Sequence, residues 1–161
     1  MIRNPLLNSH RAVLFVGIDP GSSSGGLAHI DMDLNCNTLR FKDVTEKDLY
    51  QYISSLTEQF NCLVILEQVH AFPGQGVSST FKFGVNYGML KGFLMASNIA
   101  FRQVTPQRWQ AYFNMKRKPQ ESQPMWKKRL KQRAQELYPD TKINTETADA
   151  VLIAEYCRNN W

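Results

Sequence analysis

The sequence has few cysteines and no long apolar run. Its three cysteines, Cys36, Cys62 and Cys157, are scattered and have no C-x-x-C spacing. This odd, sparse set argues against a disulfide framework or a zinc site and indicates a reducing compartment. No apolar run approaches the roughly 18 residues that a membrane helix needs, and the first residues lack the pattern of a signal peptide. We therefore expect a cytoplasmic protein that does not partner a membrane.

Acidic residues are almost absent from one stretch of the chain. Residues 102–133 contain ten basic residues and one acid, Glu121, so this stretch has a net charge of +9 within a chain of net charge +5. Aromatic residues, among them Trp109 and Trp126, are interleaved with the positive charges. An ordinary solvated helix face would carry acidic partners at i,i+4 spacing. A one-sided basic region with aromatic residues is instead typical of a nucleic-acid-binding surface.

Length and composition predict a single globular domain over residues 1–161, without repeats or linkers. Hydrophobic patterns predict strands at residues 12–18, 25–32, 38–44, 62–66 and 101–104. Periodicity and capping residues predict helices at residues 46–60, 79–97, from 106, from 124 to before 139, and at 145–158. Polar loops are expected at residues 70–76 and 115–123.

The order of these elements predicts an α/β domain with a mixed sheet. The first three strands can form an antiparallel meander. The strands that end at Asp19 and Glu67 are apolar on both faces, and we expect them to lie side by side and parallel. Both carboxylates then emerge at the carboxyl edge of the sheet, where open α/β sheets place their sites.

A turn rich in glycine and serine, Pro20-Gly-Ser-Ser-Ser-Gly-Gly26, follows Asp19. Such a turn can offer backbone N–H groups to a phosphate, and a carboxylate on a rigid strand end can hold a metal ion. In the last helix the apolar stripe of Leu152 and Ile153 continues back to two acids, Asp149 and Glu146.

The two acids of the last helix have two explanations. They can interact with the positive end of the helix dipole, or they can face a cation at the sheet edge. Four carboxylates converging on one edge repel each other, and together with Asp19 and Glu67 they favour the cation. All-oxygen ligands suit Mg²⁺ or Mn²⁺. A metal pair beside a phosphate-binding surface is the arrangement that hydrolyses a phosphodiester.

Three segments resemble the RuvC-type Holliday-junction resolvases, particularly their phage-borne relatives, within the ribonuclease H-like superfamily. They are IDPGSSSGG, LEQVHAFPGQGVSSTFKFG and ETADAVLIAEY, and they occur in the family's order. The resemblance runs from about Ala12 to Tyr156. It implies a ribonuclease H-like α/β fold, a five-stranded mixed sheet flanked by helices. It also implies two Mg²⁺ ions, for which Mn²⁺ substitutes, at the four acids Asp19, Glu67, Glu146 and Asp149. Glu146 stands where the bacterial enzymes commonly have Asp.

The resemblance implies a Mg²⁺-dependent crossover junction endodeoxyribonuclease of a bacterial or phage-infected cell. It would act as a homodimer and resolve four-way DNA junctions by paired symmetric nicks. The residues leave open a broader branched-DNA, flap or RNA-cleaving nuclease, and a catalytically idle DNA-binding module of the same fold. An actin-like or sugar-kinase ATPase also begins with a strand, Asp-x-Gly and a Ser/Gly turn, but it needs a second subdomain for which 161 residues leave no room.

We expect DNA contacts from the loop after Glu67 and from the basic region. The resolvases usually have a DNA-stacking aromatic residue three positions after this glutamate. Here His70 occupies the position and Phe72 follows, and the sequence leaves open which of the two contacts the junction. The expected DNA-binding residues are His70, Phe72, Gln75, Lys82, Arg108, Lys116, Arg117, Lys118, Lys127, Lys128 and Arg129.

Glycines recur every four residues in the helix expected at residues 79–97, at Gly84, Gly88 and Gly92. Each costs roughly 1 kcal/mol of helix stability relative to alanine. A close backbone approach would offset that cost, either to the chain's own sheet or to the same helix of a two-fold partner.

Overall fold

The computed structural model describes residues 10–21, 24–70, 74 and 76–161. Its strands are β1 (Val13–Asp19), β2 (Gly26–Ile30), β3 (Cys36–Arg40), β4 (Asn61–Glu67) and β5 (Ala100–Val104). Its helices are α1 (Glu46–Gln59), α2 (Val77–Ala96), α3 (Pro106–Tyr112), α4 (Gln123–Leu137) and α5 (Thr145–Asn160), and a 3₁₀ turn, η1 (Phe41–Asp43), follows β3. None of the helices in this part of the chain is long and apolar enough to cross a membrane.

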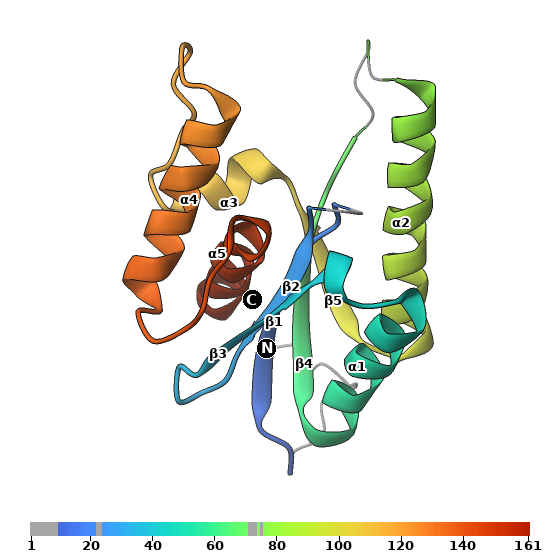
Figure 1. The fold of residues 1–161 in the computed structure, drawn as a ribbon. Helices are drawn as coiled ribbons and strands as arrows, with labels where there is room; N and C mark the ends of the chain where they lie inside the picture. The colour runs from blue at the N-terminus through green and yellow to red at the C-terminus, as the bar shows by residue number, and fades with distance from the viewer. Residues whose placement is uncertain (1–9, 22–23, 71–73, 75) are drawn as a thin grey trace.

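The strands form one mixed sheet in the order β3-β2-β1-β4-β5 (Figure 1). β1, β2 and β3 pair antiparallel, while β4 runs parallel to both β1 and β5. The predicted meander and the predicted parallel pair of apolar strands are therefore both confirmed. The parallel pairing brings the carboxyl ends of β1 and β4 to the same edge of the sheet.

Helices cover both faces of the sheet. Figure 1 shows α1 and α2 on one face and α3, α4 and α5 on the other. Alternate residues of β1, including Leu14, Val16 and Ile18, pack with the core on the α1–α2 face. Gly17 and Asp19 alternate with these residues along the strand and therefore point to the face that α5 covers.

Helix α5 lies directly on β1. A Cβ atom added to Gly17 would lie 2.3 Å from the carbonyl oxygen of Ala150 and 2.3 Å from the backbone nitrogen of Ala154. All residues of α5 from Thr147 to Cys157 are buried, which explains the near-continuous run of small and apolar residues there. Only a glycine at position 17 permits this contact between the backbones of strand and helix.

Strand β3 ends earlier than the sequence predicts. We expected a strand over residues 38–44, but the chain leaves the sheet at Arg40 and turns through η1. The backbone N–H of Phe41 donates to the Gly25 carbonyl (3.2 Å), and that of Val44 donates to the Phe41 carbonyl (3.3 Å). An ion pair between Arg40 and Asp43 (2.6 Å) closes the turn. Burial of the Phe41 ring against the core outweighs the β-forming pattern of the sequence.

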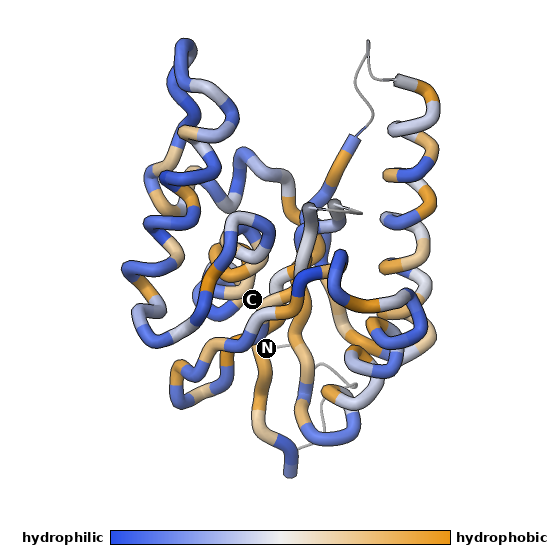
Figure 2. The backbone as a smooth tube through the Cα atoms, viewed as in Figure 1, coloured by the Kyte–Doolittle hydropathy of each residue, from blue (hydrophilic) through white to orange (hydrophobic). Residues whose placement is uncertain are grey.

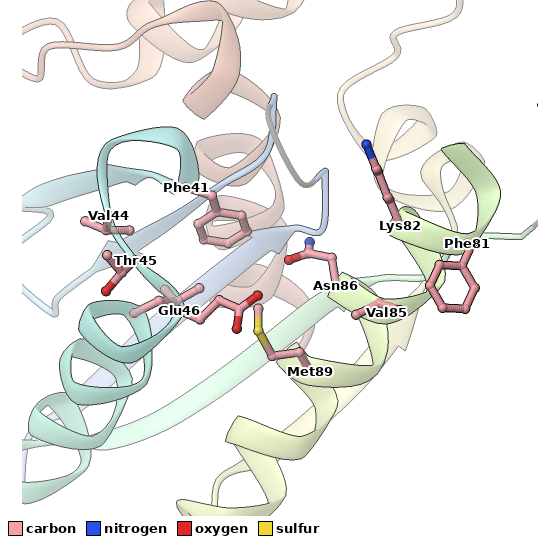
Figure 3. Close-up of a pocket in the computed structure, with 10 residues that line it drawn as sticks. Phe41, Val44, Thr45, Glu46, Phe81, Lys82, Val85, Asn86 and Met89 are labelled. Atoms are coloured by element: carbon pink, nitrogen blue, oxygen red, sulfur yellow. The ribbon is translucent and has the colours of Figure 1, made fainter. Parts of the chain in front are cut away.

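Helix α2 leaves much of its apolar surface exposed. Apolar residues recur along its whole length (Figure 2), and Val77, Phe81 and Val85 are 87%, 72% and 53% exposed. A hollow of about 340 Å³ separates this part of α2 from η1 and the start of α1 (Figure 3). Asn86 points across it to the end of β1, where its side-chain amide donates to the Pro20 carbonyl (2.5 Å).

The glycines of α2 do not pack on the chain's own sheet. A Cβ atom added at Gly84, Gly88 or Gly92 would meet no other atom of the described residues within 4 Å, apart from neighbouring parts of the helix itself. The expectation of tight packing on the sheet is therefore wrong, because the glycine stripe faces open space.

Two Gly→Ala substitutions should have opposite effects on stability. Gly17→Ala places a methyl group inside the backbone of α5 and should lower the free energy of unfolding by about 3 kcal/mol. Gly88→Ala meets nothing and should raise it by about 1 kcal/mol through helix propensity. Urea unfolding at low protein concentration measures both. Equal effects of the two substitutions would contradict the contact between α5 and β1.

Candidate active site

Three acidic side chains converge at the carboxyl edge of the sheet. Asp19 ends β1 and Glu67 ends β4, one residue beyond the paired Ile18 and Leu66. Strand alternation directs both acids to the α5 face, because Gly17 and Ile65 two residues earlier pack there. Asp149 joins them from the second turn of α5. Asp19, Glu67 and Asp149 are only 9%, 9% and 6% exposed.

The turn after β1 orients the carboxylate of Asp19. The backbone N–H of Gly21 donates to Asp19 Oδ1 (3.2 Å), and that of Gly25 donates to the Gly21 carbonyl (3.0 Å). A Cβ atom on Gly25 would lie 2.2 Å from the Gly21 oxygen, so glycine is required for this closed turn. The sequence allows this glycine- and serine-rich turn either to bind a phosphate or to accompany a carboxylate that holds a metal ion. These contacts support the second role, because they orient the carboxylate of Asp19.

Glu67 is held by a tryptophan from α3. The indole Nε1 of Trp109 donates to Glu67 Oε1 (2.9 Å), and the Trp109 side chain is fully buried. The sequence places this ring within the basic region, and it gives no sign of the hydrogen bond. That bond arises because β5 pairs with β4 and leads directly into α3, beside the end of β4. It fixes one oxygen of Glu67 and leaves the other for a ligand.

Lys127 of α4 reaches the acid cluster. Its Nζ lies 2.5 Å from Asp149 Oδ2 in a partly buried ion pair. The sequence predicts Lys127 as a DNA contact, whereas the structure places its ammonium group beside the acids of the sheet edge. The other oxygen of Asp149, Oδ1, is buried and has no hydrogen-bond partner among the described residues. This orphaned oxygen is costly unless a cation or a donor approaches it.

Burial raises the pKa of all three acids, and the charge of a neighbouring acid adds to the shift at Asp19 and Glu67. Burial, followed by the charge of Asp149, raises the pKa of Asp19 to about 7. Burial, followed by the charge of Asp19, raises the pKa of Glu67 to about 8. Burial also raises the pKa of Asp149, and Lys127 opposes that shift. The positive charge of Lys127 is therefore not enough to offset the burial and mutual repulsion of these carboxylates.

A divalent cation fits this cluster by the chemistry of its donors. Among the described residues, no three acidic, histidine or cysteine side chains are arranged to hold a metal ion as they stand. The ammonium group of Lys127, which bonds to one of the acids and neighbours the other two, supplies part of the positive charge. The oxygen-only donors, the raised pKa values and the orphaned Asp149 oxygen all suit Mg²⁺ or Mn²⁺. Asp19, Glu67 and Asp149 are the residues that would hold it.

Glu146 stands apart from the other three acids. Its Oε1 lies 2.5 Å from Nζ of Lys42 in η1, and this hydrogen bond holds the pKa of Glu146 down to about 2. Its two side-chain oxygens bond to Lys42 and to the hydroxyl of Thr145. Of the four acids expected to converge, the structure thus groups three and pairs the fourth with a lysine.

The predicted DNA-binding residues fall into separate groups. Arg129 is engaged within the protein, because it pairs with Glu121 (2.8 Å) and lies over the ring of Trp126. Arg117 donates to the backbone carbonyl of Glu121 (2.9 Å), and the backbone N–H of Lys118 donates to its carboxylate (3.1 Å). Glu121 therefore ties the polar loop before α4 to the helix.

The remaining predicted contacts are surface side chains or lie outside the description. The exposed ones are His70, Lys82, Arg108, Lys116, Lys118 and Lys128. Phe72 and Gln75 lie outside the described residues, so which ring contacts the junction stays open.

Comparison with known proteins links the fold to two solved structures of one protein. No family model and no curated protein matches the sequence. The structure is similar to "T. thermophilus RuvC in complex with Holliday junction substrate", with a TM-score of 0.62, 15% identity, and coverage of 94% of this chain and 97% of that one. It is also similar to "Thermus thermophilus RuvC structure" (TM-score 0.53, 14% identity, coverage 88% and 90%).

The fold is ribonuclease H-like. The sheet order and the flanking helices match those of RuvC, which confirms the predicted fold class. The yeast mitochondrial Holliday junction resolvase Ydc2 matches at a TM-score of 0.44 and 16% identity, over 96% of this chain and 86% of that one. At these identities the similarity shows the fold alone.

The stability of the metal-free protein should depend on the ionisation of Asp19. The pKa of this carboxyl rises from 3.8 to about 7 on folding, so the folded state keeps a proton that the unfolded state has lost. Protonation of Asp19 therefore favours the folded state. Relative to higher pH, this stabilisation is complete below about pH 4, and it is lost as the pH rises through 7 and the folded protein releases the proton. Asp19→Asn removes that loss and should be more stable than the native protein at pH 8 in EDTA.

Urea unfolding of both proteins between pH 5 and pH 8 measures this effect. The difference between them isolates Asp19 from His29, whose pKa is lowered by burial and acts in the opposite direction. Adding Mg²⁺ at pH 8 should stabilise the native protein more than the variant. A constant difference across the pH range would contradict the assignment of a raised pKa to Asp19.

Proposed function

We propose that the protein is a metal-dependent endonuclease that resolves four-way DNA junctions by paired symmetric nicks. The observation that carries the proposal is the group of three buried carboxylates with an orphaned Asp149 oxygen, at the edge where β1 and β4 end. The fold supports it, because a similar structure is that of RuvC in complex with Holliday junction substrate. The three sequence motifs that resemble the resolvases support it independently.

The chain's own residues would orient the reacting groups. Asp19, Glu67 and Asp149 would hold one Mg²⁺, and Glu146 would contribute to a second once its carboxylate is free of Lys42. When bound, the two ions supply an activated water and stabilise the leaving oxygen of the phosphodiester. Gly21 and Trp109 keep the carboxylates of Asp19 and Glu67 in fixed orientations. Lys127 supplies a positive charge beside the reacting phosphate.

The basic residues would hold the DNA backbone. Lys116, Lys118 and Lys128 belong to α4 and the loop before it, and their side chains are exposed. The same helix carries Lys127 to the acids, so a strand bound along α4 passes the site. The loop after Glu67, which begins at His70, would contact the bases at the junction.

We expect the working unit to be a two-fold dimer. A four-way junction needs two nicks at symmetric positions, and each chain has one group of acids. An isologous C2 dimer meets this need. The open glycine stripe and the exposed Phe81 and Val85 of α2 are our candidate contact, since small residues at i,i+4 spacing allow two helices to approach closely.

A catalytically idle DNA-binding module is the second candidate. The observation that favours it is that lysines already neutralise two of the four acids, Asp149 through Lys127 and Glu146 through Lys42. Such a module would bind junctions without cleaving them in any metal. A branched-DNA or RNA-cleaving nuclease would instead cleave flaps or RNA–DNA hybrids as well as junctions.

Cleavage of a synthetic mobile junction separates these functions. The native protein should make paired symmetric nicks in Mg²⁺ or Mn²⁺, none in EDTA, and few in Ca²⁺, whose looser geometry permits binding without efficient turnover. Asp19→Asn and Glu67→Gln should reduce the rate by about 100-fold or more. Their affinity for the junction should stay equal or improve, because one negative charge facing the phosphate is removed.

Asp33→Asn is a matched control, since this exposed acid lies on the β2–β3 turn. Flap and RNA–DNA hybrid substrates, run in parallel, test the breadth of specificity. Robust cleavage in EDTA, or by the Asp19→Asn protein, would overturn the metal-dependent mechanism.

Binding to the same junction tests the basic surface and the dimer. Each phosphate contact releases a counterion, so changing Lys116, Lys118 and Lys128 together to Gln should flatten the dependence of log Kd on log salt by about 2 to 3. Sedimentation of the native complex in Ca²⁺ should give two chains per junction. The matched control is Lys47→Gln, which removes an exposed charge from the first turn of α1, on the other face of the sheet. An unchanged salt slope, or one chain per junction, would contradict this model of binding.

A further inference from the structure

The ion pair between Lys42 and Glu146 joins two distant parts of the chain. Lys42 lies in η1, just after β3, and Glu146 lies in the first turn of α5. The two charged atoms are 2.5 Å apart, and the side chains are 43% and 21% exposed. The nuclease mechanism uses Glu146 as a ligand, but it gives no role to Lys42.

The backbone holds Lys42 in position beside α5. Phe41 is buried, and its N–H donates to the Gly25 carbonyl (3.2 Å), so η1 is tied to the start of β2. The start of β2 in turn packs against α5: a Cβ atom on Gly26 would lie 3.1 Å from the Glu146 carbonyl oxygen. The fold therefore places Lys42 within reach of Glu146, and the pair does not depend on a chance position of a free surface side chain.

The two acids of α5, Glu146 and Asp149, differ in whether they have a free oxygen for a cation. Both oxygens of Glu146 have partners, Oε1 with Lys42 and Oε2 with the hydroxyl of Thr145 (3.3 Å). Asp149 keeps a buried oxygen, Oδ1, that has no partner in the part of the chain that the structure describes. A cation can therefore meet a free oxygen at the three-acid cluster, whereas at Glu146 it must first displace Lys42.

We propose that Lys42 controls access to Glu146: its ammonium group competes with a metal ion for this carboxylate, and a DNA phosphate that binds Lys42 releases Glu146 to the metal. The proposal rests on the metal-dependent function proposed above. It makes Lys42 a phosphate contact and a positioning residue that couples substrate binding to completion of the site.

Thermodynamic linkage gives the proposal a measurable form. In this proposal a DNA phosphate binds Lys42 and a metal ion binds Glu146, so each ligand frees the partner that the other needs. Each must therefore tighten the binding of the other by the same factor. Lys42 is exposed enough to turn from the carboxylate to a phosphate, whose oxygens are equally good acceptors. Loss of the Lys42 charge should therefore tighten metal binding in the absence of DNA and weaken the coupling between DNA and metal.

The first experiment measures Mn²⁺ binding to the full chain without DNA, by electron paramagnetic resonance and calorimetry. Lys42→Gln should bind the ion that involves Glu146 at least about five-fold more tightly than the native protein. Lys42→Arg, which keeps the charge and the hydrogen bond, should behave as the native protein does. Lys47→Gln, a loss of the same charge five residues along, should leave Mn²⁺ binding unchanged.

The second experiment measures coupling with an intact four-way junction, using Ca²⁺ as the ion. Ca²⁺ should tighten junction binding by the native protein, and this factor should fall towards one in Lys42→Gln. A purely structural role for Lys42 would not change the factor. Urea unfolding of each variant confirms that it is folded.

The outcomes distinguish this proposal from the proposed function. Equal Mn²⁺ binding by the native and Lys42→Gln proteins would overturn the role of Lys42 and leave the metal site standing. No Mn²⁺ binding by either protein would overturn both. Tighter Mn²⁺ binding with an unchanged coupling factor would overturn the release of Glu146 by DNA.

Discussion

The backbone contact between α5 and β1 at Gly17 is the constraint on which the rest of the site depends. It brings the helix axis close enough to the sheet for Asp149 to reach the edge where Asp19 and Glu67 emerge. Helix α4 packs on α5 in turn, and this second layer delivers Lys127 to the same edge. A larger residue at position 17 would move the helix outwards, and with it one acid, its lysine and the basic surface.

The grouped acids of the site lower the stability of the fold, and two lysines of the protein reduce this loss. Three buried carboxylates at one edge would be strongly unfavourable if all were ionised without compensation. Lys127 offsets part of this repulsion, and Lys42 does the same for Glu146. Each lysine comes from an element that differs from the one carrying its acid. Both lysines are partly exposed, so their ammonium groups remain accessible to solvent.

Sequence patterns predict those features that depend on local periodicity. Alternation and continuous apolar runs gave the five strands and the positions of Asp19 and Glu67, and the helical stripe placed Asp149 on the buried face of α5. They do not predict contacts that long side chains make between separate elements. The Trp109–Glu67 hydrogen bond and the Lys127–Asp149 pair are of this kind, since no spacing in the sequence relates their members. For the same reason the sequence predicts Arg129 as a DNA contact but does not predict its ion pair with Glu121.

The order of the elements along the chain has a consequence for biosynthesis. β1 is made early, yet the face that carries Gly17 and Asp19 is covered only by α5, about 130 residues later. Contacts between such distant segments form slowly because a long loop must first close. During translation, one apolar face of the early strands therefore stays exposed until α5 has been made. An exposed apolar face of this kind can bind chaperones or aggregate. Asp149 also cannot join Asp19 and Glu67 before α5 leaves the ribosome, so a partly synthesised chain lacks the complete group of three acids.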